Sequence, residues 1–336
     1  MVSSANSIVK PQTVFITRIV PQKGLDLILN APGVEADIWQ EEMPPPRDVL
    51  LEKVRGIDGL YCLLTEKIDG ELLDAAGPQL KVVSLMAVGY DNVDVAACTA
   101  RGIPVGHTPG VLTEATADLA LALLLATARQ VVRAAEAVKA GRWQTWEPLG
   151  FIGPDVYGST VGIIGLGKIG LAVARRLRGF DVRLLYHNRS PNPAATEVGA
   201  AYVGLDTLLA ESDFVSLHCP LTPETRHLIN AGRLRQMKRT AVLINTARGE
   251  VVDQDALVEA LRQGTIGYAG LDVTTPEPLP ADSPLLALPN VTVLSHIGSA
   301  SISAREKMAT MAAENLLAGL RGERLPNCVN PEVYEG

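Results

Sequence analysis

The fold of this 336-residue chain is decided by Val161-Gly-Ile-Ile-Gly-Leu-Gly-Lys-Ile-Gly170. The first four residues are largely apolar and predict a buried strand. The residues that follow predict an amphipathic helix, because Ile169, Val173 and Leu177 share one face at helical spacing. Another apolar strand is predicted at 182–186. The segment therefore predicts a strand, a helix and a second strand, which is the βαβ unit of a parallel sheet.

Three glycines in this segment have separate roles. Gly165 permits a tight turn after the strand, and Gly167 lets the backbone approach a pyrophosphate. Gly170 lets the helix pack closely on the strand. Since a helix N-terminus attracts phosphate groups, and the strand before and the helix after are both present, the pattern predicts dinucleotide binding.

The rest of the chain extends this pattern to two sheets. Short apolar runs at 14–17, 59–64 and 82–86 predict buried strands separated by helical segments. A length of 336 residues suggests two domains, at roughly 150 residues for each. Aromatic residues make up only 4%, so the cores must be mainly aliphatic, as in helices packed on parallel strands. We predict an α/β fold with two doubly wound parallel sheets.

A long apolar helix is predicted between the two series. We expect Thr113 to cap it and the helix to continue through Ala140, where Gly141 ends it. Its most apolar part, 119–126, is shorter than the ~18 residues of a membrane span and predicts a buried helix. A loop rich in Gly and Pro follows at 150–158.

Charge and targeting signals limit the possible partners. The net charge is −7 and no basic run occurs, which argues against nucleic acid or an anionic membrane as the partner. The segment Met1–Ser7 lacks the features of a signal peptide, so we expect a cytoplasmic protein. The cysteines have no metal-ligand spacing, which predicts reduced structural thiols and no metal site. They are Cys62, Cys98, Cys219 and Cys328.

The end of the strand at 182–186 bears on the choice of dinucleotide. A carboxylate at this place would bind the ribose 2′-hydroxyl of NAD and repel a 2′-phosphate. The chain instead has His187-Asn188-Arg189-Ser190, which offers a guanidinium and neutral polar groups suited to a phosphate. We predict a preference for NADP(H), with NAD(H) still possible because Asn188 could accept a ribose hydroxyl.

Three polar residues of the C-terminal half could reduce a 2-keto acid beside a nicotinamide. His296 would donate a proton to the carbonyl oxygen, and Glu277 would hold the imidazole and favour its protonated form. Arg248 would grip the substrate carboxylate, since a guanidinium binds a planar carboxylate with two hydrogen bonds. The other four histidines are assigned structural positions: His107 in a turn, His187 in the cofactor loop, His218 at a strand end and His227 in a helix.

Several motifs resemble those of the D-isomer-specific 2-hydroxyacid dehydrogenases. They are the glycine-rich turn, 245–253, 270–279 and 295–300, and the resemblance extends from about residue 10 to 325. Within the family, 141–149 and 315–322 look most like glyoxylate/hydroxypyruvate reductases.

The resemblance implies two domains with distinct tasks. A discontinuous, flavodoxin-like substrate domain would comprise 1–106 plus 300–336, and a Rossmann domain for the dinucleotide would comprise 107–299. The active site would lie in the cleft between them, and the protein would be a homodimer.

The resemblance also implies individual site residues. Backbone amides near Val88 and Gly89 would bind the substrate carboxylate, together with Arg248 and His296, and Trp146 would limit substrate bulk from the neighbouring subunit. The implied cofactor-binding residues are Thr113, Gly165, Leu166, Gly167, Lys168, Ile169, Gly170, Asn188, Arg189, Ser190, Cys219, Pro220, Thr225, Thr246, Ala247, Arg248, Asp272, His296 and Gly298.

Two classes of function are compatible with these residues. The first is an NADPH-dependent reductase that converts glyoxylate to glycolate and hydroxypyruvate to D-glycerate. Its variants within the family are D-lactate, phosphoglycerate and phosphite dehydrogenases, although Val88 stands where the phosphite enzymes have lysine. The second class is a dinucleotide-sensing scaffold like the corepressors of this fold. The polar trio favours the enzyme, but the sequence does not rank the keto acids.

Overall fold

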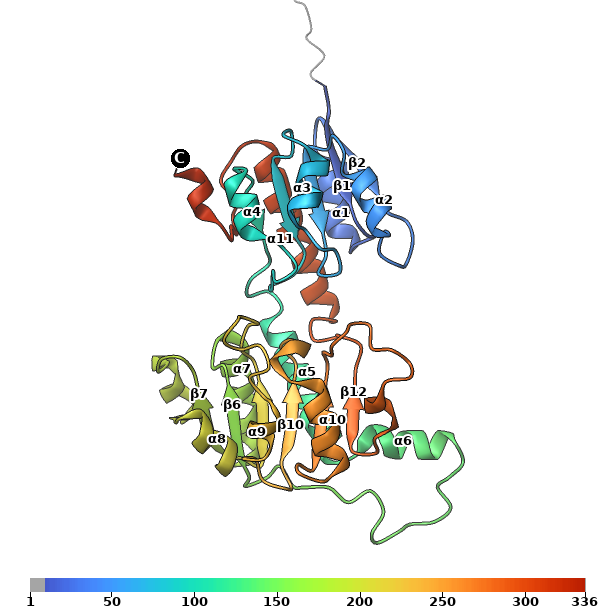
Figure 1. Cartoon of the computed structure of the whole chain (residues 1–336), viewed down its shortest axis with the longest axis vertical. Helices are drawn as coiled ribbons and strands as arrows, with labels where there is room; N and C mark the ends of the chain where they lie inside the picture. Colours follow the sequence, from blue (N-terminus) through green and yellow to red (C-terminus); the bar gives the residue numbers. More distant parts are fainter. Residues whose placement is uncertain (1–9, 336) are drawn as a thin grey trace, which may run out of the picture. The chain divides into compact units, whose positions relative to one another are not determined.

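The computed structural model describes residues 10–335, so the segment Met1–Ser7 lies outside the described residues. The chain forms two compact units (Figure 1). The first unit contains the chain up to Leu112 and from Ser301 onward, and the second is Thr113–Ala300. The two units divide after residues 112 and 300, whereas the predicted domain boundaries fall after residues 106 and 299. The tasks assigned to the two domains remain predictions.

The first unit contains a five-stranded parallel sheet in the order β2-β1-β3-β4-β5. The strands are β1 (Gln12–Ile16), β2 (Val34–Ile38), β3 (Gly59–Cys62), β4 (Val82–Leu85) and β5 (Val105–Gly106). This is the flavodoxin-like order, in which the direction of winding reverses between β1 and β3. The three apolar runs predicted as strands form β1, β3 and β4.

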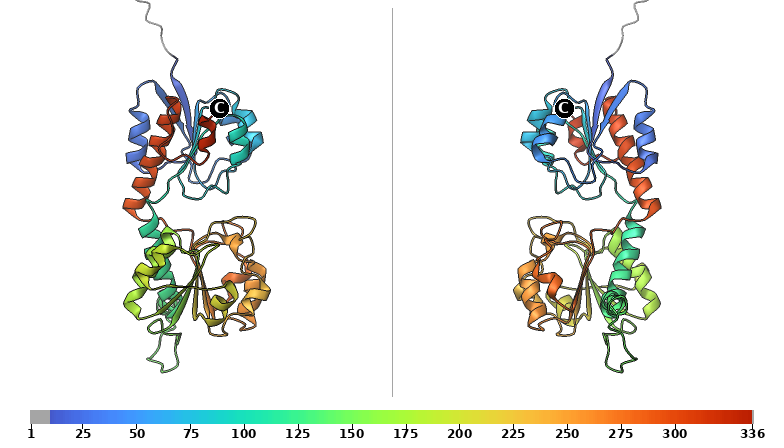
Figure 2. Two further views of the ribbon diagram at one scale, coloured as in Figure 1. Left: turned by 90° about the vertical axis from the view of Figure 1, so that its left-hand side faces the viewer. Right: turned by 90° about the vertical axis from the view of Figure 1, so that its right-hand side faces the viewer.

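Helices cover both faces of this sheet (Figure 2). They are α1 (Gln22–Leu29), α2 (Arg47–Lys53), α3 (Gly70–Ala76), α4 (Val95–Ala100), α11 (Ile302–Leu320) and the 3-10 helix η5 (Pro331–Tyr334). The C-terminal α11 packs beside α1, where a Cβ on Gly24 would lie 2.7 Å from Ala309. Ser84 in β4 donates a hydrogen bond to the carbonyl of Ala312, 2.7 Å away. These contacts place α11 in the first unit, although it is distant from that unit in sequence.

The second unit contains a seven-stranded parallel sheet in the order β12-β11-β10-β9-β6-β7-β8. The strands are β6 (Thr160–Ile164), β7 (Arg183–His187), β8 (Ala201–Tyr202), β9 (Phe214–Leu217), β10 (Val242–Asn245), β11 (Tyr268–Leu271) and β12 (Val291–Val293). Counted from β6, this is the Rossmann order with a seventh strand at the edge. The predicted fold class, two doubly wound parallel α/β sheets, is confirmed.

Two buried layers flank the second sheet. The helices are α5 (Thr113–Ala128), α6 (Val131–Lys139), α7 (Lys168–Leu177), α8 (Leu205–Glu211), α9 (Ala231–Leu234) and α10 (Gln254–Arg262), with 3-10 helices η1 (Arg178–Phe180), η2 (Pro193–Val198), η3 (Gly249–Val251) and η4 (Pro284–Ala287). Val242 and Ile244 of β10 face α5 and α7, whereas Leu243 faces α8, α9 and α10. Both sides of the strand are buried, which explains its continuous apolar run.

The prediction of one helix from Thr113 through Ala140 is wrong. Thr113 is the first residue of α5, and the helix breaks at Gln130, which has a left-handed φ of 48°. The Gln130 amide donates to the carbonyl of Ile152 (2.6 Å) and accepts from Arg133 (2.9 Å). Helix propensity does not reveal this break, because a loop distant in sequence stabilises it.

The break also bears on the membrane question. Among residues 10–335, no single helix is long and apolar enough to cross a membrane. The pair α5 and α6 meets that criterion only when taken together, and the two helices are bent by 66° at the break.

The four cysteines are free, and Cys62, Cys98 and Cys219 are buried.

Candidate active site in the second unit

The glycine-rich turn joins β6 to α7. Gly165 has φ of 96°, and a Cβ there would lie 2.6 Å from the backbone nitrogen of Cys219. A Cβ on Gly170 would lie 2.3 Å from the Gly165 carbonyl oxygen, whereas one on Gly167 would meet open space. No side chain caps α7 at Gly167, so its first amides can serve a bound anion. These features fit a dinucleotide pyrophosphate.

Two asparagines hold the turn from outside. The Leu166 amide donates to the Asn188 side chain at 2.7 Å, and the Asn192 side chain donates to the Leu166 carbonyl at 2.6 Å. The Asn188 amide oxygen is therefore engaged by protein, which favours a positioning role for this residue. Sequence analysis missed Asn192, although an Asn before Pro at a helix start is a recognisable capping signal, and it does cap η2.

The loop after β7 presents Arg189 and Ser190, which are both exposed. Hydrogen bonding to Thr222 is the main cause that lowers the pKa of Glu224, and the charge of Arg189 contributes to that lowering. Within the loop 219–225, the Thr225 hydroxyl donates to the Pro220 carbonyl at 2.7 Å. Pro220 and Thr225, two of the implied cofactor-binding residues, are thus in direct contact.

Glu277 and His296 lie in contact. His296 Nδ1 is 2.8 Å from Glu277 Oε2, and both side chains retain some exposure, 26% and 31%. A carboxylate can only accept here, so the proton resides on Nδ1 and Nε2 is left for exchange with another molecule. Burial raises the pKa of Glu277, but contact with His296, the hydrogen bond from the Thr274 amide and the charge of Arg248 outweigh burial and lower it below the ordinary value.

Asp272 fixes the backbone around His296. The amides of Ile297 and Gly298 donate to its carboxylate, each at 2.8 Å, and the His296 amide donates to its carbonyl at 2.9 Å. Burial raises the pKa of Asp272 above its ordinary value, although the hydrogen bonds from these amides oppose the shift. His296 has a left-handed φ of 55°, which is uncommon outside glycine, and these hydrogen bonds hold that conformation.

Arg248 precedes a glycine that allows an unusually close backbone approach. A Cβ on Gly249 would lie 1.9 Å from the carbonyl oxygen of Thr274. The Thr274 amide in turn donates to Glu277 Oε1 at 3.0 Å. The Arg248 guanidinium donates to the Ala247 carbonyl at 2.9 Å. The strand ends that carry Arg248 and Glu277 are thereby held together, and sequence analysis did not identify Gly249 as the cause.

The remaining histidines differ partly from their predicted positions. His227 lies in a turn with φ of 51° and not in a helix, because α9 begins only at Ala231. His218 follows β9 as predicted, with Nε2 2.8 Å from the Ser216 hydroxyl, and burial lowers its pKa to about 4. Its Nδ1 lies 3.5 Å from the Thr246 hydroxyl, so His218 adjoins a predicted cofactor residue.

Other predicted site residues lie on other elements of the chain. Val88 and Gly89 belong to the first unit, where the Val88 carbonyl lies 3.0 Å from His107 Nδ1. Trp146 is 78% exposed in the loop after α6. Thr113, at the start of α5, is half-buried.

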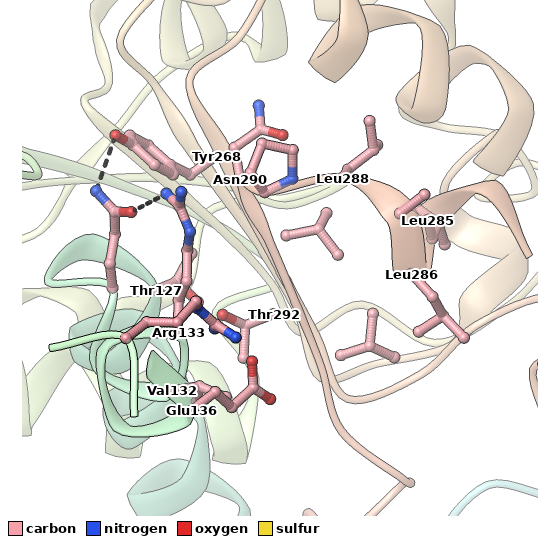
Figure 3. A pocket seen from close by; sticks show the side chains of 16 residues that line it. Thr127, Val132, Arg133, Glu136, Tyr268, Leu285, Leu286, Leu288, Asn290 and Thr292 are labelled. Carbon is pink, nitrogen blue, oxygen red and sulfur yellow. Dashed lines mark hydrogen bonds between the residues drawn. The ribbon is translucent and has the colours of Figure 1, made fainter. Parts of the chain in front are cut away.

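A pocket of about 370 Å³ lies elsewhere in the second unit (Figure 3). Arg133, Glu136 and Tyr268 line it, together with the segment 285–293. None of the predicted site residues is among its lining residues. It is therefore distinct from the Glu277–His296 contact.

Comparison with known proteins identifies the family. The sequence model of the D-isomer specific 2-hydroxyacid dehydrogenase NAD-binding domain matches residues 121–298. The chain is 53% identical to a glyoxylate reductase of Korarchaeum cryptofilum, over 97% of this chain and 98% of the relative. The chain belongs to the D-isomer specific 2-hydroxyacid dehydrogenase family. Another relative in the comparison, a glyoxylate reductase of Thermococcus kodakarensis, is 51% identical over 96% of this chain and 97% of its own length.

Solved structures agree with this family. A Thermus thermophilus protein has a TM-score of 0.89 and 50% identity, covering 95% of this chain and 100% of that one. An NADPH-dependent glyoxylate/hydroxypyruvate reductase of Sinorhizobium meliloti, solved with NADP and malonate, has a TM-score of 0.82 and 35% identity. It covers 96% of this chain and 98% of its own. The predicted family is confirmed, and its members supply context for the function.

Proposed function

We propose that this protein is an NADPH-preferring reductase of small 2-keto acids that converts glyoxylate to glycolate and hydroxypyruvate to D-glycerate. The observation that carries the proposal is the 2.8 Å contact between Glu277 and His296, with the charge of Arg248 acting on the same carboxylate. The relatives named glyoxylate reductase support the choice of glyoxylate. Hydroxypyruvate is supported by the name of the Sinorhizobium meliloti enzyme.

Each residue of this trio has one task in the proposed reaction. Arg248 binds the substrate carboxylate, and the amides of Val88 and Gly89 contribute to the same task. Bound NADPH would supply hydride for the carbonyl carbon. His296 donates its Nε2 proton to the carbonyl oxygen, while Glu277 holds Nδ1. The added hydride and proton convert the carbonyl to the hydroxyl of the 2-hydroxy acid.

Absorbance of the reduced nicotinamide tests this proposal directly. The purified protein would be mixed with glyoxylate, hydroxypyruvate or pyruvate, with NADPH and NADH in parallel. We expect turnover with glyoxylate and hydroxypyruvate, and faster turnover with NADPH. Measurable NADPH binding without turnover of any of these acids would contradict the reductase and favour a sensing scaffold.

The NADPH preference depends on Arg189. Its exposed guanidinium and the lack of a carboxylate at the end of β7 support binding of a 2′-phosphate. We predict that Arg189→Ala raises the Kd of NADPH about tenfold or more, since a hydrogen bond to a charged group contributes about 1.5–3 kcal/mol. The Kd of NADH should change little. Fluorescence titration measures both, and equal losses for the two dinucleotides would exclude the phosphate assignment.

We also propose that the protein is a homodimer. Several apolar side chains of α6 and the following loop are exposed in the single chain, which is typical of a surface that another subunit covers. They are Val131, Val138, Trp143, Trp146, Leu149 and Ile152. In this arrangement Trp146 would narrow the partner's substrate site.

Light scattering tests the homodimer. We predict a mass twice the 35.7 kDa of one chain, and a shift toward 35.7 kDa in Leu149→Glu. Leu149 is 82% exposed, so the substitution should leave the fold of the single chain intact. A monomeric parent protein would contradict the proposal.

A further inference from the structure

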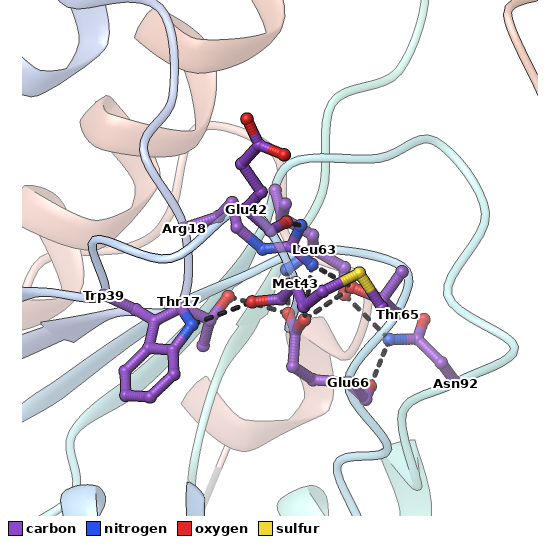
Figure 4. Close-up of polar contacts among 9 residues, drawn as sticks. All are labelled: Thr17, Arg18, Trp39, Glu42, Met43, Leu63, Thr65, Glu66 and Asn92. Atoms are coloured by element: carbon purple, nitrogen blue, oxygen red, sulfur yellow. Dashed lines mark hydrogen bonds and ion pairs between the residues drawn. The ribbon is translucent and has the colours of Figure 1, made fainter. Parts of the chain in front are cut away.

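A buried carboxylate lies at the carboxyl end of the first unit's sheet (Figure 4). Glu66 is 3% exposed, although Thr65 and Lys67 on either side are exposed. Its Oε2 accepts from the Thr17 hydroxyl and from the Leu63 amide, both at 2.7 Å. Its Oε1 accepts from the Thr65 hydroxyl. A carboxylate with this many donors is fixed in position rather than free to move.

Arg18 connects the same cluster to neighbouring loops. Its guanidinium lies 3.9 Å from Glu66 Oε1 and donates to the Thr65 hydroxyl at 3.3 Å. It also donates to the carbonyl of Glu42, in the loop after β2. Arg18 Nε is buried and has no hydrogen-bond partner among the described residues. An unpaired buried donor lowers the stability of the fold. This cost argues that Arg18 has a role besides stabilising the fold.

Asn92 extends the network to the loop that follows β4. Its side-chain amide donates to the carbonyls of Leu63, at 3.0 Å, and Glu66, at 2.7 Å. The other end of that loop is held where His107 Nδ1 lies 3.0 Å from the Val88 carbonyl. Gly89 therefore lies between two anchored points of one short segment. One anchor depends on Glu66 and its donors.

The location of the cluster also favours a role in binding. Thr17 follows β1 and Leu63 follows β3, and these two strands flank the point where the winding of the sheet reverses. In open α/β sheets, ligands bind outside the carboxyl ends of the strands at this point. Glu66 lies beneath that surface, where it can hold the loops that present backbone amides.

We propose that Glu66 is a positioning residue for the substrate carboxylate. It joins the loops after β1, β3 and β4, and thereby holds the Val88 and Gly89 amides in the orientation that binds the anion. This inference rests on the proposed function, in which these amides bind the substrate. Glu66 itself is not a catalytic residue, since it is buried and its carboxylate is held by the Thr17, Leu63 and Thr65 donors.

Glu66→Gln tests the proposal with two independent readouts. Gln can keep its oxygen toward the Leu63 N–H, but its NH2 group then replaces the oxygen that accepts from Thr65 and faces Arg18, and the charge that strengthens all of these contacts is lost. We expect faster hydrogen exchange in a peptide covering 86–92 of the cofactor-free protein. We also expect the KM for glyoxylate to rise about tenfold, with kcat within about twofold, because a hydrogen bond to a charged group is lost. The Kd of NADPH should not change.

Glu71→Gln is the matched control. Glu71 is an exposed glutamate of the same unit, and it pairs with Arg47 at 2.8 Å, a residue outside the cluster around Glu66. In the Glu71→Gln protein, hydrogen exchange at 86–92 and the KM for glyoxylate should equal those of the parent protein. A folded Glu66→Gln protein with parental exchange at 86–92 and parental KM would overturn the proposal. A fall in kcat alone would overturn it as well.

Thr17→Val provides a second test if Glu66→Gln does not fold. It removes one donor to Glu66 at nearly constant volume. We expect a smaller increase in hydrogen exchange at 86–92 and a rise of about threefold in the KM for glyoxylate. If hydrogen exchange at 86–92 and the KM both kept their parental values, the proposal would be overturned. If the parent protein reduces no keto acid, the proposed function fails, whereas the exchange experiment still decides whether Glu66 holds the 86–92 segment.

Discussion

His296→Asn is expected to lower kcat for glyoxylate by about 10²–10⁴-fold, the usual contribution of a positioned proton donor. Asn is the suitable replacement because His296 has a left-handed φ of 55°, a conformation that Asn tolerates better than Ala. The variant would keep the Asp272 contacts to the backbone, which do not involve the imidazole. The Kd of NADPH, measured by fluorescence, should therefore remain near the parental value.

His227→Asn is the matched control for this variant. His227 also has a left-handed φ, 51°, and it is exposed in a turn with no assigned chemical role. Its kcat should equal that of the parent protein. If His296→Asn retained near-parental turnover, His296 would not be the proton donor. A loss of NADPH binding in the same variant would indicate a structural effect instead.

The fold was predictable because its signals are local. The strand and helix around Gly165 follow from apolar spacing over a few residues, and the structure has them at Thr160–Ile164 and Lys168–Leu177. The break at Gln130 was not predictable in this way. It depends on the carbonyl of Ile152, which a loop brings from 22 residues away. Local propensity gives no information about such a contact.

In the candidate site, too, some features followed from the sequence and others depend on contacts between distant residues. The residue types at 248, 277 and 296 indicated a cation, a carboxylate and an acid, and the structure places Glu277 and His296 in contact. The groups that hold them were not apparent from sequence. Asp272 was predicted as a cofactor residue, whereas the structure shows its carboxylate bound to the backbone after His296. The importance of Gly249 likewise appears only when Thr274 is brought against it.

Gly249→Ala is expected to damage both stability and activity. The added Cβ would lie 1.9 Å from the Thr274 carbonyl oxygen and 2.2 Å from its carbonyl carbon, so the backbone must shift. We expect a loss of about 3 kcal/mol or more in the free energy of unfolding, at the upper end for overpacked sites. Displaced groups also reduce catalysis, because misplacement by about 1 Å can cost about 10²-fold in rate.

Gly179→Ala separates this steric effect from the general effect of replacing glycine. Gly179 lies in η1, and a Cβ there would meet nothing within 4 Å. Its unfolding free energy should stay within about 0.5 kcal/mol of the parent value, as for most surface substitutions. Denaturant unfolding and kcat for glyoxylate would be measured for both variants. Because Gly249 lies between Arg248 and the turn that carries Glu277, parental stability and kcat in Gly249→Ala would show that this close approach does not position the proposed catalytic groups.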